Sequence, residues 1–151
     1  MTTLLGVDLR DRRVLVVGGG TVAARRLPGL VAAGAHVVVV AAHPADDVRV
    51  LAAAGQVTLL ERPVLEADLE GAWLVHACTG DAAVDAAVAG WSEERRTFCV
   101  VASAVGLGSA RVPATATVDD VVLGVVSAGA PDPRRVAGLR DGLAALVRTG
   151  A

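Results

Sequence analysis

Three consecutive glycines follow the apolar run VLVV (residues 14–17) and come directly before a segment with helical composition. Gly18, Gly20 and Ala23 fit the pattern G-x-G-x-x-G/A. In this pattern the first glycine permits a tight turn, the second lets a pyrophosphate approach the backbone, and the third small residue packs the helix against the strand. Backbone N–H groups at the helix start then face the phosphates. A glycine loop between strand and helix predicts dinucleotide binding, and the alternative is a plain tight turn in an α/β domain.

The other apolar segments of the chain are continuous runs of Val and Leu rather than alternating patterns. Strands that are apolar on both faces are typical of parallel sheets covered by helices. The sequence predicts a Rossmann-like α/β fold with a doubly wound, mostly parallel sheet. Pro28, inside the first expected helix, is predicted to kink or shorten it. The expected strands are residues 14–17, 36–41, 57–60, 73–78 and 98–103, and the expected helices are residues 21–33, 46–54 and 81–96.

The pattern changes after Ser103. The following segment is predicted to be loop-like and then extended, with a short extra strand region at residues 121–129. Residues 134–150 alternate arginines with apolar positions and predict a C-terminal amphipathic helix. A length of 151 residues without an internal repeat fits one domain, so we expect a single domain over residues 1–151.

Composition excludes several classes of function. The net charge of −2 gives no basic face for a nucleic acid, and the apolar runs are too short for a membrane span or a signal peptide. Two distant cysteines, Cys78 and Cys99, match neither a disulfide framework nor a metal site, and both are expected to be small buried side chains. We therefore expect no metal site, no membrane or nucleic-acid partner, and a cytoplasmic location.

Further cofactor contacts are expected where the parallel strands end, because ligands of open α/β sheets bind at that edge. The acidic residue that commonly holds the adenine ribose is missing from the end of the second strand, where Ala42 and His43 stand. Thr79 and Asp81 follow the fourth strand and are predicted to line the cofactor site. Asp81 is equally well placed to cap the next helix, and the two roles are compatible. His76, within the strand, is predicted to be a core residue.

An ordered series of motifs carries a resemblance over residues 5–147. It resembles the precorrin-2 dehydrogenase/sirohydrochlorin ferrochelatase family, the N-terminal module of siroheme synthase. The resemblance implies oxidation of precorrin-2 to sirohydrochlorin with NAD⁺ as hydride acceptor, and insertion of Fe²⁺ by many members. The motifs are, in order, LRDRRVLVVGGGTVAARR, GAHVVVVA, WLVHACTGDAAVDAAV, RRTFCVVAS and SARVPATATVDDVVLGVVSAG.

The resemblance also implies site residues. Cofactor contacts map onto Thr21 and Val22 after the glycines and onto Ala42 and His43 at the end of the second strand. A serine of the late loop that is phosphorylatable in the family maps onto Ser127. A homodimer is implied as well.

One position departs from the family pattern. The family carries an Asp just after the F-C-x-V-x stretch, thought to serve oxidation and metal insertion, and that position is Ser103 in this chain. A hydroxyl alone cannot do the work of a carboxylate base, but it can hydrogen-bond a substrate. Ser103 is therefore the candidate catalytic residue. Dehydrogenation is expected more strongly than ferrochelatase activity, because the cofactor supplies the difficult chemistry of hydride transfer.

Precorrin-2 carries many carboxylates, so arginines near the late loop are candidates for binding it. We expect Arg111, Ser127 and Arg134 to contact the substrate, although a solvated surface is the alternative for each arginine. The face of residues 121–126 is an alternative place for contact between two copies.

Two other functions stay open from the residues. One is a non-catalytic dinucleotide-binding or redox-sensing module, which the absence of the family Asp supports. The other is a different small oxidoreductase on the same fold, for which the chain is short, because a separate substrate domain normally needs more residues.

Overall fold

The computed structural model describes residues 2–150, which form two compact units. The larger unit is Val7–Ala110, and the smaller combines the residues up to Gly6 with those from Arg111 onward. The expectation of one domain over residues 1–151 stays a prediction.

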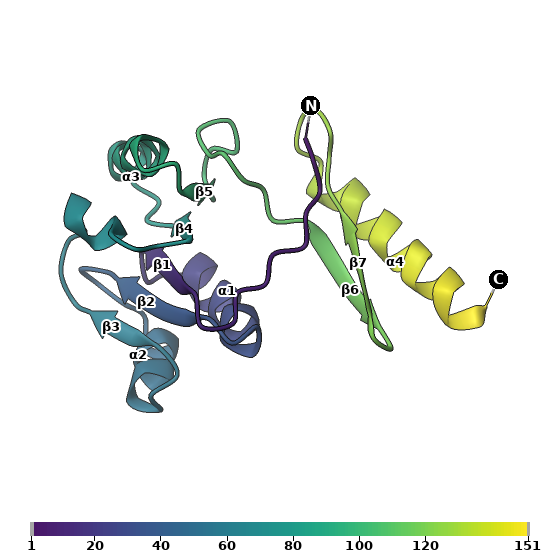
Figure 1. Cartoon of the computed structure of the whole chain (residues 1–151), viewed down its shortest axis with the longest axis horizontal. Coiled ribbons are helices and arrows are strands. Elements are labelled where there is room, and N and C mark those ends of the chain that lie inside the picture. Colours follow the sequence, from purple (N-terminus) through teal and green to yellow (C-terminus); the bar gives the residue numbers. More distant parts are fainter. Residues whose placement is uncertain (1, 151) are drawn as a thin grey trace. The chain divides into compact units, whose positions relative to one another are not determined.

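The larger unit is a five-stranded sheet in which every neighbouring pair of strands is parallel (Figure 1). Its strand order is β3-β2-β1-β4-β5, so the chain winds outward in one direction from β1 and then in the other from β4. This confirms the predicted doubly wound fold. The strands are β1 (Arg13–Val17), β2 (His36–Val40), β3 (Thr58–Leu60), β4 (Leu74–Ala77) and β5 (Phe98–Val101), and the helices are α1 (Thr21–Ala32), α2 (Asp46–Ala53), α3 (Ala82–Glu94) and the single 3-10 turn η1 (Glu66–Leu69).

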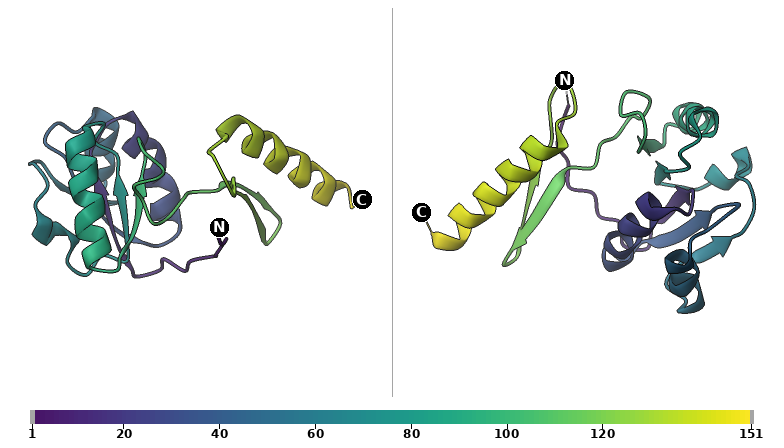
Figure 2. Two further views of the ribbon diagram at one scale, coloured as in Figure 1. Left: turned by 90° about the horizontal axis from the view of Figure 1, so that it is seen from above. Right: turned by 180° about the vertical axis from the view of Figure 1, so that it is seen from behind.

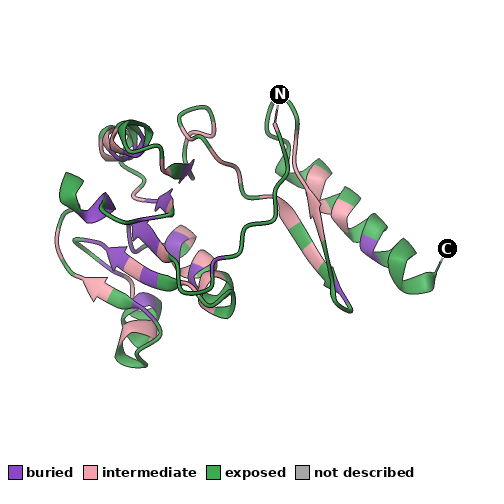
Figure 3. Ribbon diagram, in the orientation of Figure 1, coloured by how far each residue is buried: buried purple, intermediate pink, exposed green. Residues whose placement is uncertain are grey.

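Helices cover both faces of the sheet, as the continuous Val and Leu runs predict. One core cluster joins Leu15 and Val75 of the sheet to Val88 of α3, and the other joins Val16 and Val39 to the helices α1 and α2. Figure 3 shows the buried residues concentrated in the central strands. Burial on both faces fixes the sheet as the rigid base from which the loops at its carboxyl edge project.

Two details differ from the expectation. Helix α1 continues past Pro28 to Ala32, so the predicted shortening is wrong. Pro28 is exposed and its neighbour Leu27 is fully buried, so the proline ring displaces no core side chain. Strand β5 ends at Val101, which puts Ser103 in the loop beyond the strand rather than within it.

The segment that follows this loop packs along the free edge of β5. The amide of Cys99 donates to Ser109 Oγ (3.0 Å) and its carbonyl accepts from the Ala110 amide (2.9 Å). Gly108 is required here, because a Cβ at that position would stand 2.6 Å from the Cys99 carbonyl oxygen.

The smaller unit is an antiparallel hairpin with one helix lying along it (Figure 2). Strands β6 (Ala114–Val118) and β7 (Val121–Val125) are joined by Asp119 and Asp120, and Asp119 has φ +53°. Helix α4 (Pro133–Thr149) is capped by Asp132, whose carboxylate accepts from the Arg135 amide (3.0 Å). The extended segment and the amphipathic helix of the sequence analysis are therefore present, and β7 is shorter than expected. In the part of the chain that the structure describes, no helix has the length and apolarity needed to cross a membrane.

Candidate functional site at the carboxyl edge of the sheet

The glycine loop joins β1 to α1 at the carboxyl edge of the sheet. Gly18 has φ +102°, and a Cβ there would stand 2.5 Å from the carbonyl oxygen of Cys78. A Cβ on Gly19 would stand 2.8 Å from the Pro44 Cα. Both glycines are therefore required by the close approach of neighbouring loops.

Gly20 has a different role. It has φ −83°, and a Cβ on it would meet no heavy atom of the described residues within 4 Å. It is the N-cap of α1, no side chain of residues 2–150 caps this helix end, and its first turn contains no acidic residue. Thr21 is exposed and Val22 is half-buried just beyond it. Open space beside free N–H groups at a helix start is the arrangement that accommodates a phosphate.

The end of β2 carries the second set of predicted contacts. Ala42 and His43 are exposed there. Arg49 of α2 donates through Nη1 to the carbonyl of Pro44 (2.7 Å) and through Nη2 to the Glu61 carboxylate (2.8 Å). The hydrogen bond from Arg49 holds the pKa of Glu61 below its ordinary value. Glu61 directly follows β3. The carboxyl edge therefore does contain an acidic residue, but at the end of β3 rather than at the end of β2, where the sequence pattern places it.

The end of β4 contains Thr79 and Asp81. The Asp81 carboxylate accepts from the amides of Ala83 (2.8 Å) and Val84 (3.2 Å), which confirms that Asp81 caps α3. The Thr79 hydroxyl donates to Asp85 Oδ1 (2.6 Å), and the Thr79 amide donates to the same oxygen (3.2 Å). Gly18, whose Cβ position faces Cys78, lies against this same loop.

Asp85 is a candidate site residue that the sequence did not predict. It lies in the first turn of α3 and is fully buried, and its Oδ2 accepts a hydrogen bond from Ser103 Oγ (2.7 Å). No ion pair to Asp85 is present within the described part of the chain. The available signal was an acidic residue inside the otherwise apolar stretch AAVDAAVAG, directly after a strand end. Asp85 ties the loops after β4 and β5 together.

His76 is buried on β4, as predicted for a core residue. Neither of its ring nitrogens has a hydrogen-bond partner among residues 2–150, and the same holds for Nε of Arg26. Burial, reinforced by the nearby Arg26 charge, lowers the pKa of His76 to about 4, so the imidazole is neutral at physiological pH. Cys78 and Cys99 are buried free thiols, and burial raises the pKa of each.

The predicted substrate residues all fall in the smaller unit. Arg111 donates through Nη1 to the carbonyls of Ser127 (3.0 Å) and Gly129 (2.9 Å), while Ser127 Oγ accepts from the Asp132 amide (3.2 Å). Arg134 is exposed at the start of α4. Arg111 and Ser127 therefore shape one loop, and their contact with a substrate stays a prediction.

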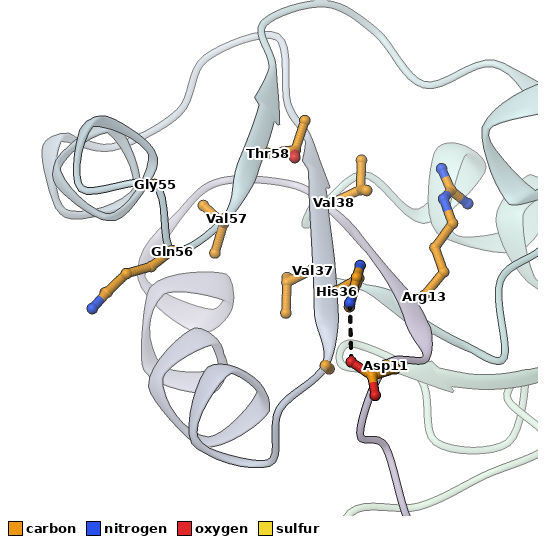
Figure 4. A pocket seen from close by; sticks show the side chains of 10 residues that line it. Asp11, Arg13, His36, Val37, Val38, Gly55, Gln56, Val57 and Thr58 are labelled. Carbon is orange, nitrogen blue, oxygen red and sulfur yellow. Dashed lines mark ion pairs between the residues drawn. The ribbon is translucent and has the colours of Figure 1, made fainter.

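One hollow of the surface lies elsewhere in the larger unit. It encloses about 500 Å³ around the amino ends of β1 and β2 and the start of β3 (Figure 4). Asp11 and His36 face each other in it, with Oδ1 and Nε2 3.4 Å apart. It is at the opposite end of the strands from the glycine loop. Geometry at the carboxyl edge is a better guide to the site than the size of this hollow, because ligands of such sheets bind at that edge. Among residues 2–150, His, Cys, Asp and Glu form no group of three that could hold a metal ion.

A doubly wound parallel sheet whose first strand leads through a glycine loop into a free helix N-terminus defines a dinucleotide-binding α/β domain. Comparison with known proteins agrees with this class: a family described as putative NAD(P)-binding matches residues 5–114. The chain belongs to this family.

Individual relatives are similar along most of the chain. Siroheme synthase of Salmonella arizonae is 39% identical over 122 residues, which are 81% of this chain and 27% of the relative. Siroheme synthase of Citrobacter koseri is 37% identical over 140 residues, which are 93% of this chain and 30% of the relative. The chain thus spans less than a third of the length of these relatives.

A solved structure is similar as well. SirC, a precorrin-2 dehydrogenase, superimposes with a TM-score of 0.80 at 29% sequence identity. The match covers 96% of this chain and 70% of SirC. It therefore extends beyond the glycine loop and includes both compact units.

Proposed function

We propose that this chain catalyses the NAD-dependent oxidation of precorrin-2 to sirohydrochlorin in siroheme biosynthesis. The observation that carries this proposal is the similarity to SirC over nearly the whole chain, combined with the open, uncapped start of α1 at Gly20. An NAD-binding fold alone supports only a dinucleotide-binding module, whereas similarity across both units supports a dehydrogenase of the same kind.

The residues at the carboxyl edge fit a dinucleotide. Gly18 and Gly20 shape the loop, and the amides of Thr21 and Val22 face the diphosphate. Ala42, His43, Thr79 and Asp81 line the rest of the cofactor site in this proposal. When bound, NAD⁺ supplies the chemistry of hydride acceptance.

Glu61 supports NAD⁺ over NADP⁺. Arg49 is the cation nearest in sequence to the end of β2, and its guanidinium is paired with Glu61 at 2.8 Å. A 2′-phosphate at this place would meet the Glu61 carboxylate and would have to compete with it for Arg49. A ribose 2′-hydroxyl can instead donate to a carboxylate.

Substrate binding is assigned to the smaller unit. The carboxylates of precorrin-2 suit guanidinium groups, which bind them by paired hydrogen bonds. Arg134 is exposed and available for this role, and Arg111 shapes the loop of Ser127. Insertion of Fe²⁺ as a second substrate is the less favoured activity, because Ser103 stands where the family has a carboxylate.

Assembly and location complete the proposal. Apolar side chains of β7 and α4 are about half exposed, which supports a homodimer through the smaller unit, and static light scattering tests it. The buried free thiols are compatible with a reducing cytoplasm. The exposed apolar residues are Val121, Val122, Leu139, Leu143, Leu146 and Val147.

The experiment mixes the protein with precorrin-2 and NAD⁺ and follows the absorbance of NADH and of sirohydrochlorin. A simultaneous rise in the absorbance of NADH and of sirohydrochlorin supports the dehydrogenase. Binding of NAD⁺ in calorimetry without turnover would favour the second candidate, a non-catalytic dinucleotide-binding or redox-sensing module, for which the absence of a carboxylate at Ser103 is the supporting observation.

A further inference from the structure

Asp85 is a buried carboxylate that the fold does not need for ion pairing. It is fully buried, and it faces no cation close enough for an ion pair among the described residues. Burying such a group costs free energy, and the hydrogen bonds from Thr79 and Ser103 offset that cost. An apolar residue at this position in α3 would need no such partners, so a buried carboxyl group here calls for an explanation.

Ser103 connects this carboxylate to the surface. The serine is exposed, whereas Asp85 beneath it is not. The Ser103 hydroxyl donates its hydrogen to Asp85 Oδ2 at 2.7 Å, so the lone pairs of its oxygen are left free to accept a proton from outside. Thr79 holds the other carboxylate oxygen through its amide and hydroxyl, which fixes the orientation of the Asp85 side chain.

We propose that Ser103 and Asp85 form a relay that accepts the proton lost by precorrin-2 during its oxidation. The inference rests on the proposed function. Ser103 is the catalytic residue that touches the substrate, and Asp85 acts through it as a positioning residue and final proton acceptor. The relay takes the place of the carboxylate that relatives of this kind are expected to carry at position 103.

The balance of the reaction defines what the relay does. Conversion of precorrin-2 to sirohydrochlorin removes one hydride, which NAD⁺ accepts, and one proton. As the substrate proton bonds to Ser103 Oγ, the original hydroxyl proton passes to Asp85 Oδ2. The serine ends neutral and the carboxylate ends as a carboxylic acid. The proton then returns through Ser103 to solvent when the product leaves, so no alkoxide forms at any stage.

Single substitutions test the relay. Asp85→Asn retains an oxygen for the Thr79 donors but offers Ser103 an amide N–H instead of an acceptor, and Ser103→Ala removes the hydroxyl. Each should lower kcat by about a hundredfold or more, the usual contribution of a general base. The KM for precorrin-2 and the affinity for NAD⁺ should change less than about threefold, because the groups proposed to bind the substrate carboxylates and the diphosphate stay in place in both variants. Ser103→Thr keeps a hydroxyl at this position and should therefore recover part of the kcat that Ser103→Ala loses.

A double variant that moves the carboxylate from position 85 to position 103 distinguishes a catalytic role of Asp85 from a purely structural one. In the double variant Asp85→Asn/Ser103→Asp, the carboxylate moves to position 103 and the new amide beneath it donates to it. Ser103→Asp alone would put two carboxylates side by side, and their repulsion would obscure the result. The double variant should regain kcat to within about tenfold of the wild type, since a carboxylate again accepts the proton. A purely structural role for Asp85 predicts no such recovery.

Binding measurements keep the outcomes distinct. Titration of each variant with NAD⁺ and with sirohydrochlorin, together with its melting temperature, shows whether the site is intact without relying on turnover. Unchanged kcat in Asp85→Asn or Ser103→Ala would overturn the relay while leaving the dehydrogenase in place. Absence of turnover in the wild type would overturn the proposed function itself. Loss of kcat that the double variant does not recover, with binding and melting temperature intact, would also overturn the relay.

Discussion

The guanidinium of Arg49 binds the carboxylate of Glu61 at 2.8 Å and the carbonyl of Pro44 at 2.7 Å, and so joins α2 to the ends of β2 and β3. Pro44 in turn lies against Gly19 of the glycine loop. In the proposed function, this ion pair, which lies outside the second strand, influences the choice between the two nicotinamide cofactors.

Replacement of Glu61 by Gln should shift cofactor preference toward NADP⁺. The variant frees the Arg49 charge, which then attracts a 2′-phosphate, so the affinity for NADP⁺ should rise by about tenfold, or ~1.4 kcal/mol. Affinity for NAD⁺ should fall slightly. Calorimetric titration with both cofactors measures the ratio. Adding Arg49→Ala to the variant is the control, and a gain for NADP⁺ that survives this second change would contradict the explanation.

Substitution of two glycines of the loop should have different effects, one on the stability of the fold and the other on NAD⁺ binding. Gly18→Ala introduces a Cβ 2.5 Å from the Cys78 carbonyl oxygen at φ +102°, so it should destabilise the fold by roughly 1–3 kcal/mol or more. Gly20→Ala introduces a Cβ into open space and should leave the melting temperature nearly unchanged. It should nevertheless weaken NAD⁺ binding by at least about tenfold, because the methyl group occupies the position of the diphosphate. Unchanged NAD⁺ affinity in Gly20→Ala would remove the diphosphate from this loop.

His76 should give the folding free energy a specific dependence on pH. Its folded pKa of about 4 lies below its ordinary value of 6.5, so the unfolded chain takes up a proton that the folded chain refuses. The free energy of unfolding should therefore keep its full value above pH 6.5. It should fall as the pH is lowered toward 4, by up to about 3 kcal/mol. Denaturant unfolding at several pH values measures it. His76→Leu should flatten this part of the curve, and a pH dependence that survives this substitution would belong to another group.

Substitutions of Arg111 and Arg134 by Ala should differ in their effect on the loop that contains Ser127. Arg111→Ala removes two hydrogen bonds to the loop carbonyls, so the Asp132 amide, which depends on Ser127, should exchange its hydrogen faster. Both Arg111→Ala and Arg134→Ala should raise the KM for precorrin-2 and leave NAD⁺ affinity unchanged. Hydrogen exchange of Asp132 should stay at the wild-type rate in Arg134→Ala. A wild-type KM in either variant would exclude that arginine from substrate binding.

The fold was predictable because it depends on local patterns. Continuous apolar runs such as HVVVV can only be buried on both faces, and the glycines after VLVV mark the first turn. Asp81 was recognisable as a cap because its partners follow it directly. These features need no knowledge of distant contacts.

Asp85 could not be assigned in the same way. An acidic residue in the first turn of a helix is usually explained by the helix dipole and by solvent. Its burial depends on Thr79, six residues before it, and on Ser103, eighteen residues after it, and only the assembled sheet brings these loops together. Glu61 was overlooked for a related reason, since parallel pairing of β2 and β3 decides which strand end lies beside which. Similarly, the engagement of Arg111 with Ser127 links residues sixteen positions apart.

The segment that covers β5 has a consequence for solubility at high concentration. Because Ser109 and Ala110 occupy both hydrogen-bonding groups of Cys99, a foreign strand cannot extend the sheet at this point. The opposite margin, β3, offers only the short run Thr58–Leu60 as a template. The five-stranded sheet, whose interior consists largely of valine side chains, is thereby protected at both edges from pairing with strands of other molecules.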